Sequence, residues 1–283
     1  MRVGSRLHIT HRTGYRYADV VDASFNEVRM TPLTVDGQML LSHSLQIVPA
    51  AAVQTYTDYW GATVESFDVH VPHRILEVVA ISTVDTPPLP EPAPGTTWDR
   101  VLDPDMQDKY AEFLAATDYV DDATTDPARA FIVESMSRAD DPADAAMTAM
   151  AAVRERFTYS PGITDVSTTA AQAWASKHGV CQDFTHAMLS LLRSARIPAR
   201  YVSGYLHTEE PAQGQTVTGE SHAWVEYWDG RWQAVDPTND RAVGSAHVIV
   251  ARGRDYADVP PLQGIYAGGH SEGLGVSVEI TQW

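Results

Sequence analysis

The chain contains a single cysteine, Cys181, which stands in the stretch GVCQDFTH at residues 179–186. Apolar residues follow it at intervals of four, three and four positions (Phe184, Met188, Leu191 and Ala195). This spacing predicts a helix over residues 182–195 with one buried face. Extending that face back by three residues reaches Cys181, so we expect the thiol in the first helical turn, pointing inward but within reach of a cleft.

The position of this thiol could support nucleophilic chemistry. At the start of a helix, unpaired N–H groups and the helix dipole create partial positive charge, which favours a thiolate over a thiol. A thiolate can attack a carbonyl carbon, so Cys181 is a candidate catalytic residue. The competing interpretation is that a lone cysteine packs as a small apolar residue, and Cys181 alone does not decide between the two.

A nucleophilic cysteine needs a base, and a histidine base usually needs a carboxylate to hold its tautomer. Among the 11 histidines, His222 opens the predicted strand SHAWVEYW, and the next predicted strand, RWQAVD, ends at Asp236. His178 precedes the helix, and His186 lies about 140° around it from Cys181. His222 is therefore the better partner for the thiol.

The turn between these two strands decides whether His222 and Asp236 share a face. A two-residue loop, Asp229-Gly230, would put them on opposite faces of the sheet. A three-residue loop with a left-handed glycine, pairing Tyr227 with Arg231, places His222 directly opposite Asp236, with Cβ atoms about 5 Å apart. If the two residues work together, the bulged turn is required.

A metal site is the other chemistry that these residue types allow. The candidate ligands are His178, Cys181, His186 and His222. Their spacing matches no recognisable ligand pattern, so we predict that the protein uses no metal and no cofactor.

The elements that must position these residues differ along the chain. Residues 1–86 contain short segments rich in Val, Ile, Thr and Tyr, which predicts an all-β N-terminal domain. Residues 87–97 hold five prolines and a glycine and are expected to form a semi-rigid linker. Residues 98–283 change to helical spacing and then to strands, which predicts an α+β domain. Asp126-Pro127 and Asp141-Pro142 each have the pattern of an N-cap followed by a first helical residue.

Three segments then occur in a characteristic order: GVCQDFTHAMLSLLRSARIPARYVSGYL, SHAWVEYW and VDPTND. Together they resemble the bacterial transglutaminase-like family of the papain-like cysteine-protease superfamily, densely over residues 157–240. Residues 1–86 also resemble the N-terminal domain of many bacterial members. The resemblance implies a helix that bears the cysteine, packed on an antiparallel sheet that bears the histidine and the aspartate. It makes Cys181 the nucleophile, His222 the general base and acid, and Asp236 the residue that orients His222.

The implied chemistry is acyl transfer through a thioester, with the oxyanion held by the Cys181 backbone N–H and a second donor. Tyr159, Gln182 and Trp174 are candidates for that donor or for the cleft, although packing also explains Trp174 and Gln182 could simply face solvent. Trp224 is expected to cover the triad and exclude water. We expect a peptidase or amidase acting on a peptide or isopeptide-type amide; a protein-glutamine transamidase and a non-catalytic peptide-binding scaffold are the alternatives.

Composition excludes several other classes of function. A formal net charge of -17 disfavours binding to nucleic acid and to anionic membranes. Hydrophobic residues at 44% and charged residues at 20% are typical of a globular protein. No apolar run approaches the ~18–20 residues of a membrane span, and residues 1–17 lack the apolar core of a signal peptide. We expect a bacterial-type cytoplasmic protein; the sequence does not determine its oligomeric state.

Overall fold

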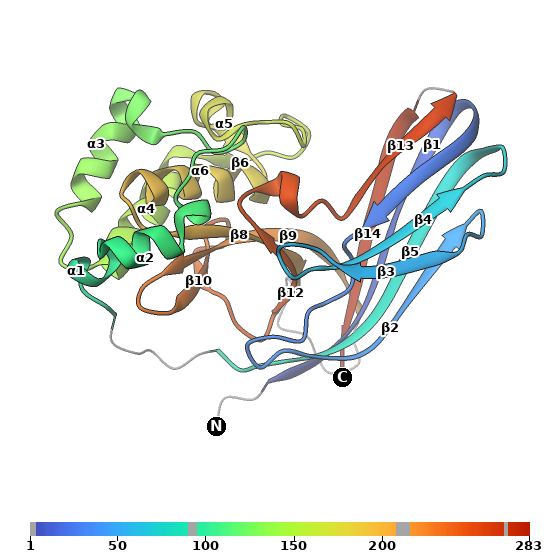
Figure 1. Ribbon diagram of the computed structural model, residues 1–283, viewed down its shortest axis with the longest axis horizontal. Helices are drawn as coiled ribbons and strands as arrows, with labels where there is room; N and C mark the ends of the chain where they lie inside the picture. The colour runs from blue at the N-terminus through green and yellow to red at the C-terminus, as the bar shows by residue number, and fades with distance from the viewer. Residues whose placement is uncertain (1–3, 90–94, 208–215, 269–270) are drawn as a thin grey trace.

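The computed structural model describes residues 4–89, 95–207, 216–268 and 271–283. Helices gather at one end of the molecule, and long strands extend from the other end (Figure 1). This arrangement of an N-terminal sheet and a mixed helix-and-sheet region confirms the predicted α+β fold class. No helix among the described residues is both long and apolar enough to cross a membrane.

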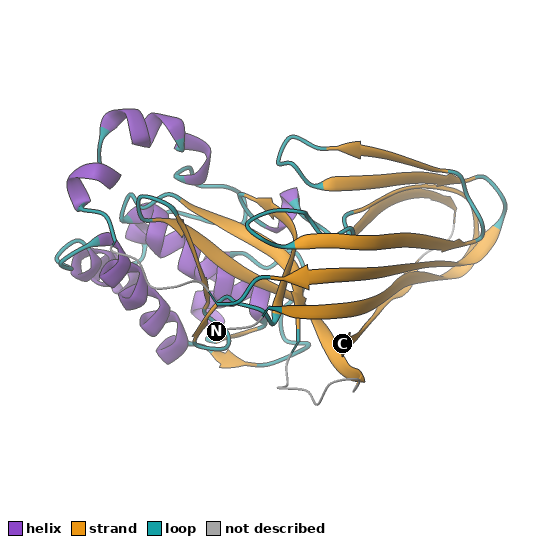
Figure 2. Cartoon of the chain, turned by 90° about the horizontal axis from the view of Figure 1, so that it is seen from below, coloured by secondary structure: helices purple, strands orange, loops and turns teal. Residues whose placement is uncertain are grey.

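The N-terminal region is a sheet built around one long strand, β1. Its strands are β1 (Ser5–Val28), β2 (Met39–Val48), β3 (Val53–Thr57), β4 (Thr63–Val69) and β5 (His73–Thr86). The first half of β1 pairs with β5 and its second half with β4, both antiparallel. Along β1 and β5 the side chains of one face are buried, which is the period-2 pattern expected of half-buried strands. Figure 2 shows these strands running side by side, away from the helices.

The chain returns to this sheet at its C-terminal end. Strands β13 (Leu262–Gly268) and β14 (Ser271–Gln282) both pair with β1, so these two strands lie in the N-terminal sheet. The predicted division instead places them in the domain of residues 98–283. That division rested on the proline-rich composition of the linker, and composition does not show which strand a returning segment pairs with.

The predicted linker, residues 87–97, falls between the last strand of the N-terminal sheet and the first helix. Strand β5 ends at Thr86 and the first helix, α1, begins at Trp98. Residues 90–94 of the predicted linker lie outside the described part of the chain. After them, the backbone N–H of Thr96 donates a hydrogen bond of 2.6 Å to Asp229 Oδ1, so the end of the linker is attached to the turn between two later strands.

The helices are α1 (Trp98–Val101), α2 (Pro104–Lys109), α3 (Pro127–Met136), α4 (Pro142–Arg156), α5 (Ala170–Ser176) and α6 (Cys181–Ser194), with 3-10 turns at Ala111–Phe113, Ala123–Thr125 and Tyr256–Asp258. Both predicted Asp-Pro starts are confirmed. Asp126 Oδ1 accepts from the N–H groups of Ala128 and Arg129, and Asp141 Oδ1 accepts from that of Asp144.

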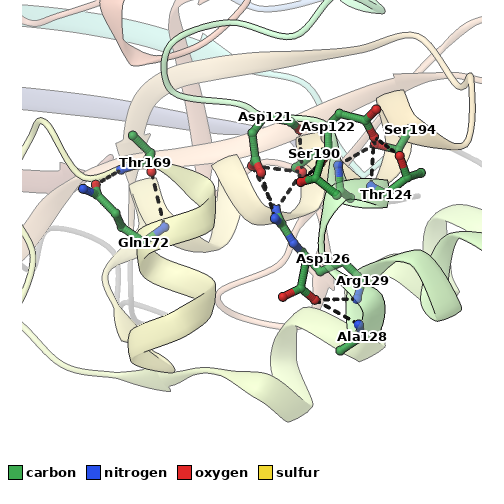
Figure 3. Close-up of polar contacts among 12 residues, drawn as sticks. Asp121, Asp122, Thr124, Asp126, Ala128, Arg129, Thr169, Gln172, Ser190 and Ser194 are labelled. Carbon is green, nitrogen blue, oxygen red and sulfur yellow. Dashed lines mark hydrogen bonds and ion pairs between the residues drawn. The ribbon is translucent and has the colours of Figure 1, made fainter.

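Polar side-chain contacts link α3 to α6 and form the start of α5 (Figure 3). The buried Arg129 of α3 donates to both carboxylate oxygens of Asp121 and to Ser190 Oγ on α6. Thr169 and Gln172 form a capping box that starts α5. The Arg129 contacts hold α6, which carries Cys181, against α3 and the segment at Asp121.

Helix α6 packs on the second sheet region. The strands of this second region run in the order β12 (His247–Gly253), β8 (Ala199–Leu206), β9 (Thr216–Trp228), β10 (Trp232–Asp236) and β11 (Arg241–Ala242). Strand β14 also pairs with β9, which joins this region to the N-terminal sheet. Two further short strands, β6 (Thr158–Tyr159) and β7 (His178–Gly179), pair in parallel just before α6.

Candidate active site

The cysteine lies at the first residue of α6, and a tight local structure holds that helix end. Asp183 Oδ2 accepts hydrogen bonds from the backbone N–H of Val180, at 2.8 Å, and from Thr164 Oγ1, at 2.7 Å. A Cβ atom on Gly179 would lie 2.5 Å from the Cβ of Asp183, so only glycine fits there. Cys181 is partly buried among core side chains, and the first N–H groups of its helix have no partner within the helix.

The histidine and the aspartate lie on neighbouring strands, β9 and β10. These strands pair Trp228 with Trp232, across a three-residue loop in which Gly230 has a φ of 75°. The predictions of a three-residue loop, a left-handed Gly230 and a shared face are confirmed. The predicted register is wrong, because the loop lies one residue further along, so that Asp236 is a diagonal neighbour of His222 and not directly opposite it.

His222 and Asp236 form a buried hydrogen-bonded pair. His222 Nε2 lies 2.8 Å from Asp236 Oδ2, and the two residues are 4% and 0% exposed. Burial opposes the protonation of His222, but its hydrogen bonds with Asp236 and Cys181 outweigh this and raise its pKa to about 10. Burial likewise favours the neutral form of Asp236, yet hydrogen bonds from His222 and His247 hold the pKa of that carboxyl well below its usual range.

Cys181 is close enough to His222 for its thiol to contribute to this raised pKa. The Nε2 atom of His222 is engaged by Asp236, which leaves Nδ1 for the contact with Cys181. Nδ1 is therefore the ring nitrogen available for proton exchange with the thiol. A protonated His222 beside Cys181 favours the thiolate, so the two residues can form the ion pair that a sulfur nucleophile needs.

Two residues that the sequence analysis did not place in the site also bind Asp236. Asn239 donates from its backbone N–H to Asp236 Oδ1 and from Nδ2 to Oδ2, at 3.1 and 2.8 Å. His247 Nε2 lies 3.3 Å from the same Oδ2. Asn239 belongs to the VDPTND segment, which carried a signal for it. His247 is on β12, and the two strands β8 and β9 lie between β12 and β10, the strand of Asp236. No sequence spacing indicates His247.

The four cleft candidates lie in different surroundings. Tyr159, on β6, is 44% exposed and its ring centroid is 6.4 Å from that of Phe184 on α6. Gln182 is 8% exposed and does not face solvent, because its Nε2 donates to the Val166 carbonyl at 3.2 Å. Tyr159 and Gln182 therefore both lie close to the first turns of the cysteine helix.

The two tryptophan candidates are both buried. Trp174 is 5% exposed and packs edge-on against Phe157 in the core. Trp224 is fully buried, with its ring centroid 6.1 Å from that of His222 and 5.3 Å from that of His247. The Trp224 ring therefore packs against both His222 and His247.

The side chains of His222, Asp236 and His247 are of the types that bind metal ions. Ligand atoms of His222, Asp236 and His247 all lie within 4.8 Å of one another, and all three residues are buried. The same atoms already hydrogen-bond to each other. The predicted absence of a metal and a cofactor stays a prediction.

Comparison with known proteins shows which families and chains this protein is similar to. The family model described as Transglutaminase-like superfamily matches residues 129–237, and the one described as Bacterial transglutaminase-like N-terminal region matches residues 7–85. An uncharacterized protein of Mycobacterium leprae (strain TN) is 39% identical over 278 residues, which cover 98% of this chain and 99% of that protein. A protein-glutamine gamma-glutamyltransferase of Pseudomonas aeruginosa is 36% identical over 101 residues, which cover 31% of this chain and 15% of that protein.

A solved structure shares the fold over nearly the whole chain. It is that of a candidate cysteine protease from Cytophaga hutchinsonii, with a TM-score of 0.75 and 21% sequence identity. The match covers 97% of this chain and 90% of that one. Both regions of the fold are therefore found together in another protein.

Proposed function

Because this chain belongs to the transglutaminase-like superfamily, we propose that it is a cysteine-dependent acyl-transfer enzyme that hydrolyses peptide or isopeptide-type amide bonds. The observation that carries the proposal is the buried pair of His222 and Asp236 beside Cys181 at the start of α6. A sole cysteine that only packed in the core would need no such partners.

The proposed reaction begins with attack of the Cys181 sulfur on the amide carbonyl carbon. Protonated His222 gives its proton to the leaving nitrogen as the C–N bond breaks, which leaves a thioester and a neutral imidazole. His222 then takes a proton from water as the water oxygen attacks the thioester carbon. The C–S bond breaks, a carboxylic acid leaves, and the thiolate and the imidazolium are restored. Asp236 keeps the ring oriented throughout.

Transamidation is the second candidate outcome of the same chemistry, in which an amine replaces water in the second step. The relative from Pseudomonas aeruginosa that is named as a glutamine gamma-glutamyltransferase supports this candidate over part of the chain. We favour hydrolysis because water is always present to attack a thioester, whereas a transamidation needs a second, amine substrate. The balance depends on which nucleophile arrives first, so it is decided by competition and not by the three residues.

The test is a screen of peptides and amines for release or incorporation that depends on Cys181. We expect the wild type to release amine or acid from at least one peptide amide and the Cys181→Ala variant to release none. Retained turnover in that variant would refute the assignment of the nucleophile. Incorporation of an added amine in preference to hydrolysis would replace hydrolysis by transamidation.

The scaffold alternative has its own test, because the chain has one cysteine and any alkylation reports on Cys181. In the proposed enzyme, iodoacetamide labels Cys181 at about pH 6 much faster than it labels a free thiol, because the ion pair supplies thiolate there. A rate equal to that of a free thiol would favour a binding scaffold without an activated cysteine.

A further inference from the structure

Asp236 accepts more hydrogen bonds than the orientation of one histidine requires. Its Oδ1 accepts from the backbone N–H groups of Thr238 and Asn239, at 3.0 and 3.1 Å. Its Oδ2 lies within hydrogen-bond distance of His222, Asn239 and His247. Asn239 is a near neighbour in the sequence, whereas His247 comes from a different strand, β12. Its contact therefore depends on how β12 is held.

The hydrogen bonds of His247 determine its tautomer. The backbone N–H of Gly244 donates to His247 Nδ1 at 3.4 Å, so Nδ1 is the unprotonated nitrogen of the neutral ring. The proton of the neutral ring is then on Nε2, which lies 3.3 Å from Asp236 Oδ2 and donates to it. His247 is 4% exposed, and this burial lowers its pKa and keeps the ring neutral. His247 thus donates a neutral hydrogen bond to the carboxylate that orients His222.

Strand β12 is held in turn by the N-terminal region. Gln38, which is 3% exposed, lies in the loop between β1 and β2. Its Oε1 accepts from the N–H of Ile249 and its Nε2 donates to the carbonyl of the same residue, both at 2.8 Å. The Ile249 carbonyl also accepts from the N–H of Leu33 at 2.9 Å. One buried side chain therefore binds both backbone groups of a residue that stands two positions from His247.

The other side of β12 is packed equally closely. Gly204 of β8 pairs with His222 on one side and with Ile249 on the other. A Cβ atom at this glycine would lie 1.9 Å from the Val248 carbonyl oxygen and 2.6 Å from the Trp224 ring. Strand β12 has little freedom to move away from the site while these contacts and Gln38 are in place.

We propose that His247 is a positioning residue for Asp236, and that the N-terminal region supports the active site by holding β12 through Gln38. This inference rests on the proposed function, because it assigns a role to His247 only if His222 activates Cys181. In this arrangement Gln38 fixes β12, β12 places His247, His247 fixes the oxygen of Asp236 that binds His222, and His222 faces the thiol.

A purely electrostatic role for His247 makes the opposite prediction. Removing a donor from Asp236 leaves its negative charge less neutralised, which would raise the pKa of His222 further and preserve its ion pair with the thiol. Removing a positioning group instead lets the carboxylate and the imidazole take other orientations, and the ion pair is lost. The sign of the change in thiol reactivity near neutral pH separates the two roles.

The test measures the second-order rate of iodoacetamide labelling of the full chain at about pH 6 and about pH 9.5, where any thiol is largely ionised. We expect His247→Leu to lower the rate at the lower pH about 10-fold or more, because a hydrogen bond to a charged group is lost. The rate at the higher pH should stay within about twofold of the wild type, since a thiolate forms there without help from His222. His247→Gln, which can still donate to Asp236, should recover most of the loss.

Two further variants complete the design. Gln38→Ala should show the same selective loss at the lower pH, and should add little to the effect of His247→Leu, since both act through β12. The control is His73→Leu, which removes another buried histidine in the N-terminal sheet, far from Asp236 in the hydrogen-bond network. It should leave the ratio of the two rates unchanged.

Three outcomes would overturn the inference. The first is an unchanged or increased rate at the lower pH in His247→Leu, when circular dichroism shows that the variant is folded. The second is an effect of Gln38→Ala that adds fully to that of His247→Leu. The third is a change in the wild-type labelling rate on adding EDTA that matches the change caused by His247→Leu. A bound metal would then explain why His222, Asp236 and His247 lie together. A wild type that reacts like a free thiol at the lower pH would instead contradict the proposed function.

Discussion

Gly179 offers the sharpest test of how the cysteine is placed. In the Gly179→Ala variant, the new Cβ would lie 2.5 Å from Asp183 Cβ and 2.6 Å from its Oδ2. An ordinary contact between carbon atoms is about 3.5 Å, so one group must move by about 1 Å. Asp183 cannot turn away without losing its bonds to Val180 and Thr164. The first turn of α6, with Cys181, must therefore shift.

The expected size of the effect follows from that shift. A displacement of about 1 Å in a reacting group costs about 100-fold in rate, whereas overpacking costs about 1–3 kcal/mol in the free energy of unfolding. We therefore expect Gly179→Ala to stay folded and to lose about 100-fold in Cys181-dependent turnover.

The assay compares Gly179→Ala with Gly275→Ala, whose new Cβ meets nothing within 4 Å. Urea unfolding measures the change in stability, and iodoacetamide labelling at about pH 6 measures the activation of Cys181. If the folded Gly179→Ala variant labels and turns over at wild-type rates, the reasoning about this helix start is refuted.

The two remaining predictions concern stability and pH. His222 has a pKa of about 10 in the folded protein against about 6.5 when unfolded, so its stabilisation is complete below pH 6.5 and declines as the pH rises toward 10. Urea unfolding between pH 6.5 and 10 should show this decline in the free energy of unfolding. The decline should be smaller in the His222→Gln variant. Burial lowers the pKa of His11 to about 4, so only the unfolded chain binds its proton between pH 6.5 and 4. As the pH is lowered through this range, the free energy of unfolding should fall by about 1.4 kcal/mol per pH unit because of this group. Urea unfolding should show a shallower slope in the His11→Phe variant.

Features that depend on near neighbours in the chain were predictable. The starts of α3 and α4 follow from Asp126-Pro127 and Asp141-Pro142, because an N-cap is made within three residues. The place of Cys181 at the start of α6 follows from the apolar spacing after it. The ends of the linker, at Thr86 and Trp98, follow from the concentration of proline between them.

The register of β9 and β10 was only partly predictable. For His222 and Asp236 to work together, their side chains must lie on the same face of the sheet. This requires an odd number of residues in the loop, and the loop has three. Which three residues form the loop depends on how Trp228 and Trp232 pack. Those side chains contact Tyr110, which lies far away in the sequence.

The sequence by itself determined which residues could do the chemistry and the local elements that carry them, because types, spacing and caps act over a few residues. Only the tertiary structure decided that His247 meets Asp236, that Gln38 holds β12, and that β14 returns to β1. These contacts join residues that are 11 to more than 200 positions apart. Each exists only after segments distant in the sequence have come together, and the alternation of side chains along a strand does not show which other strand it pairs with.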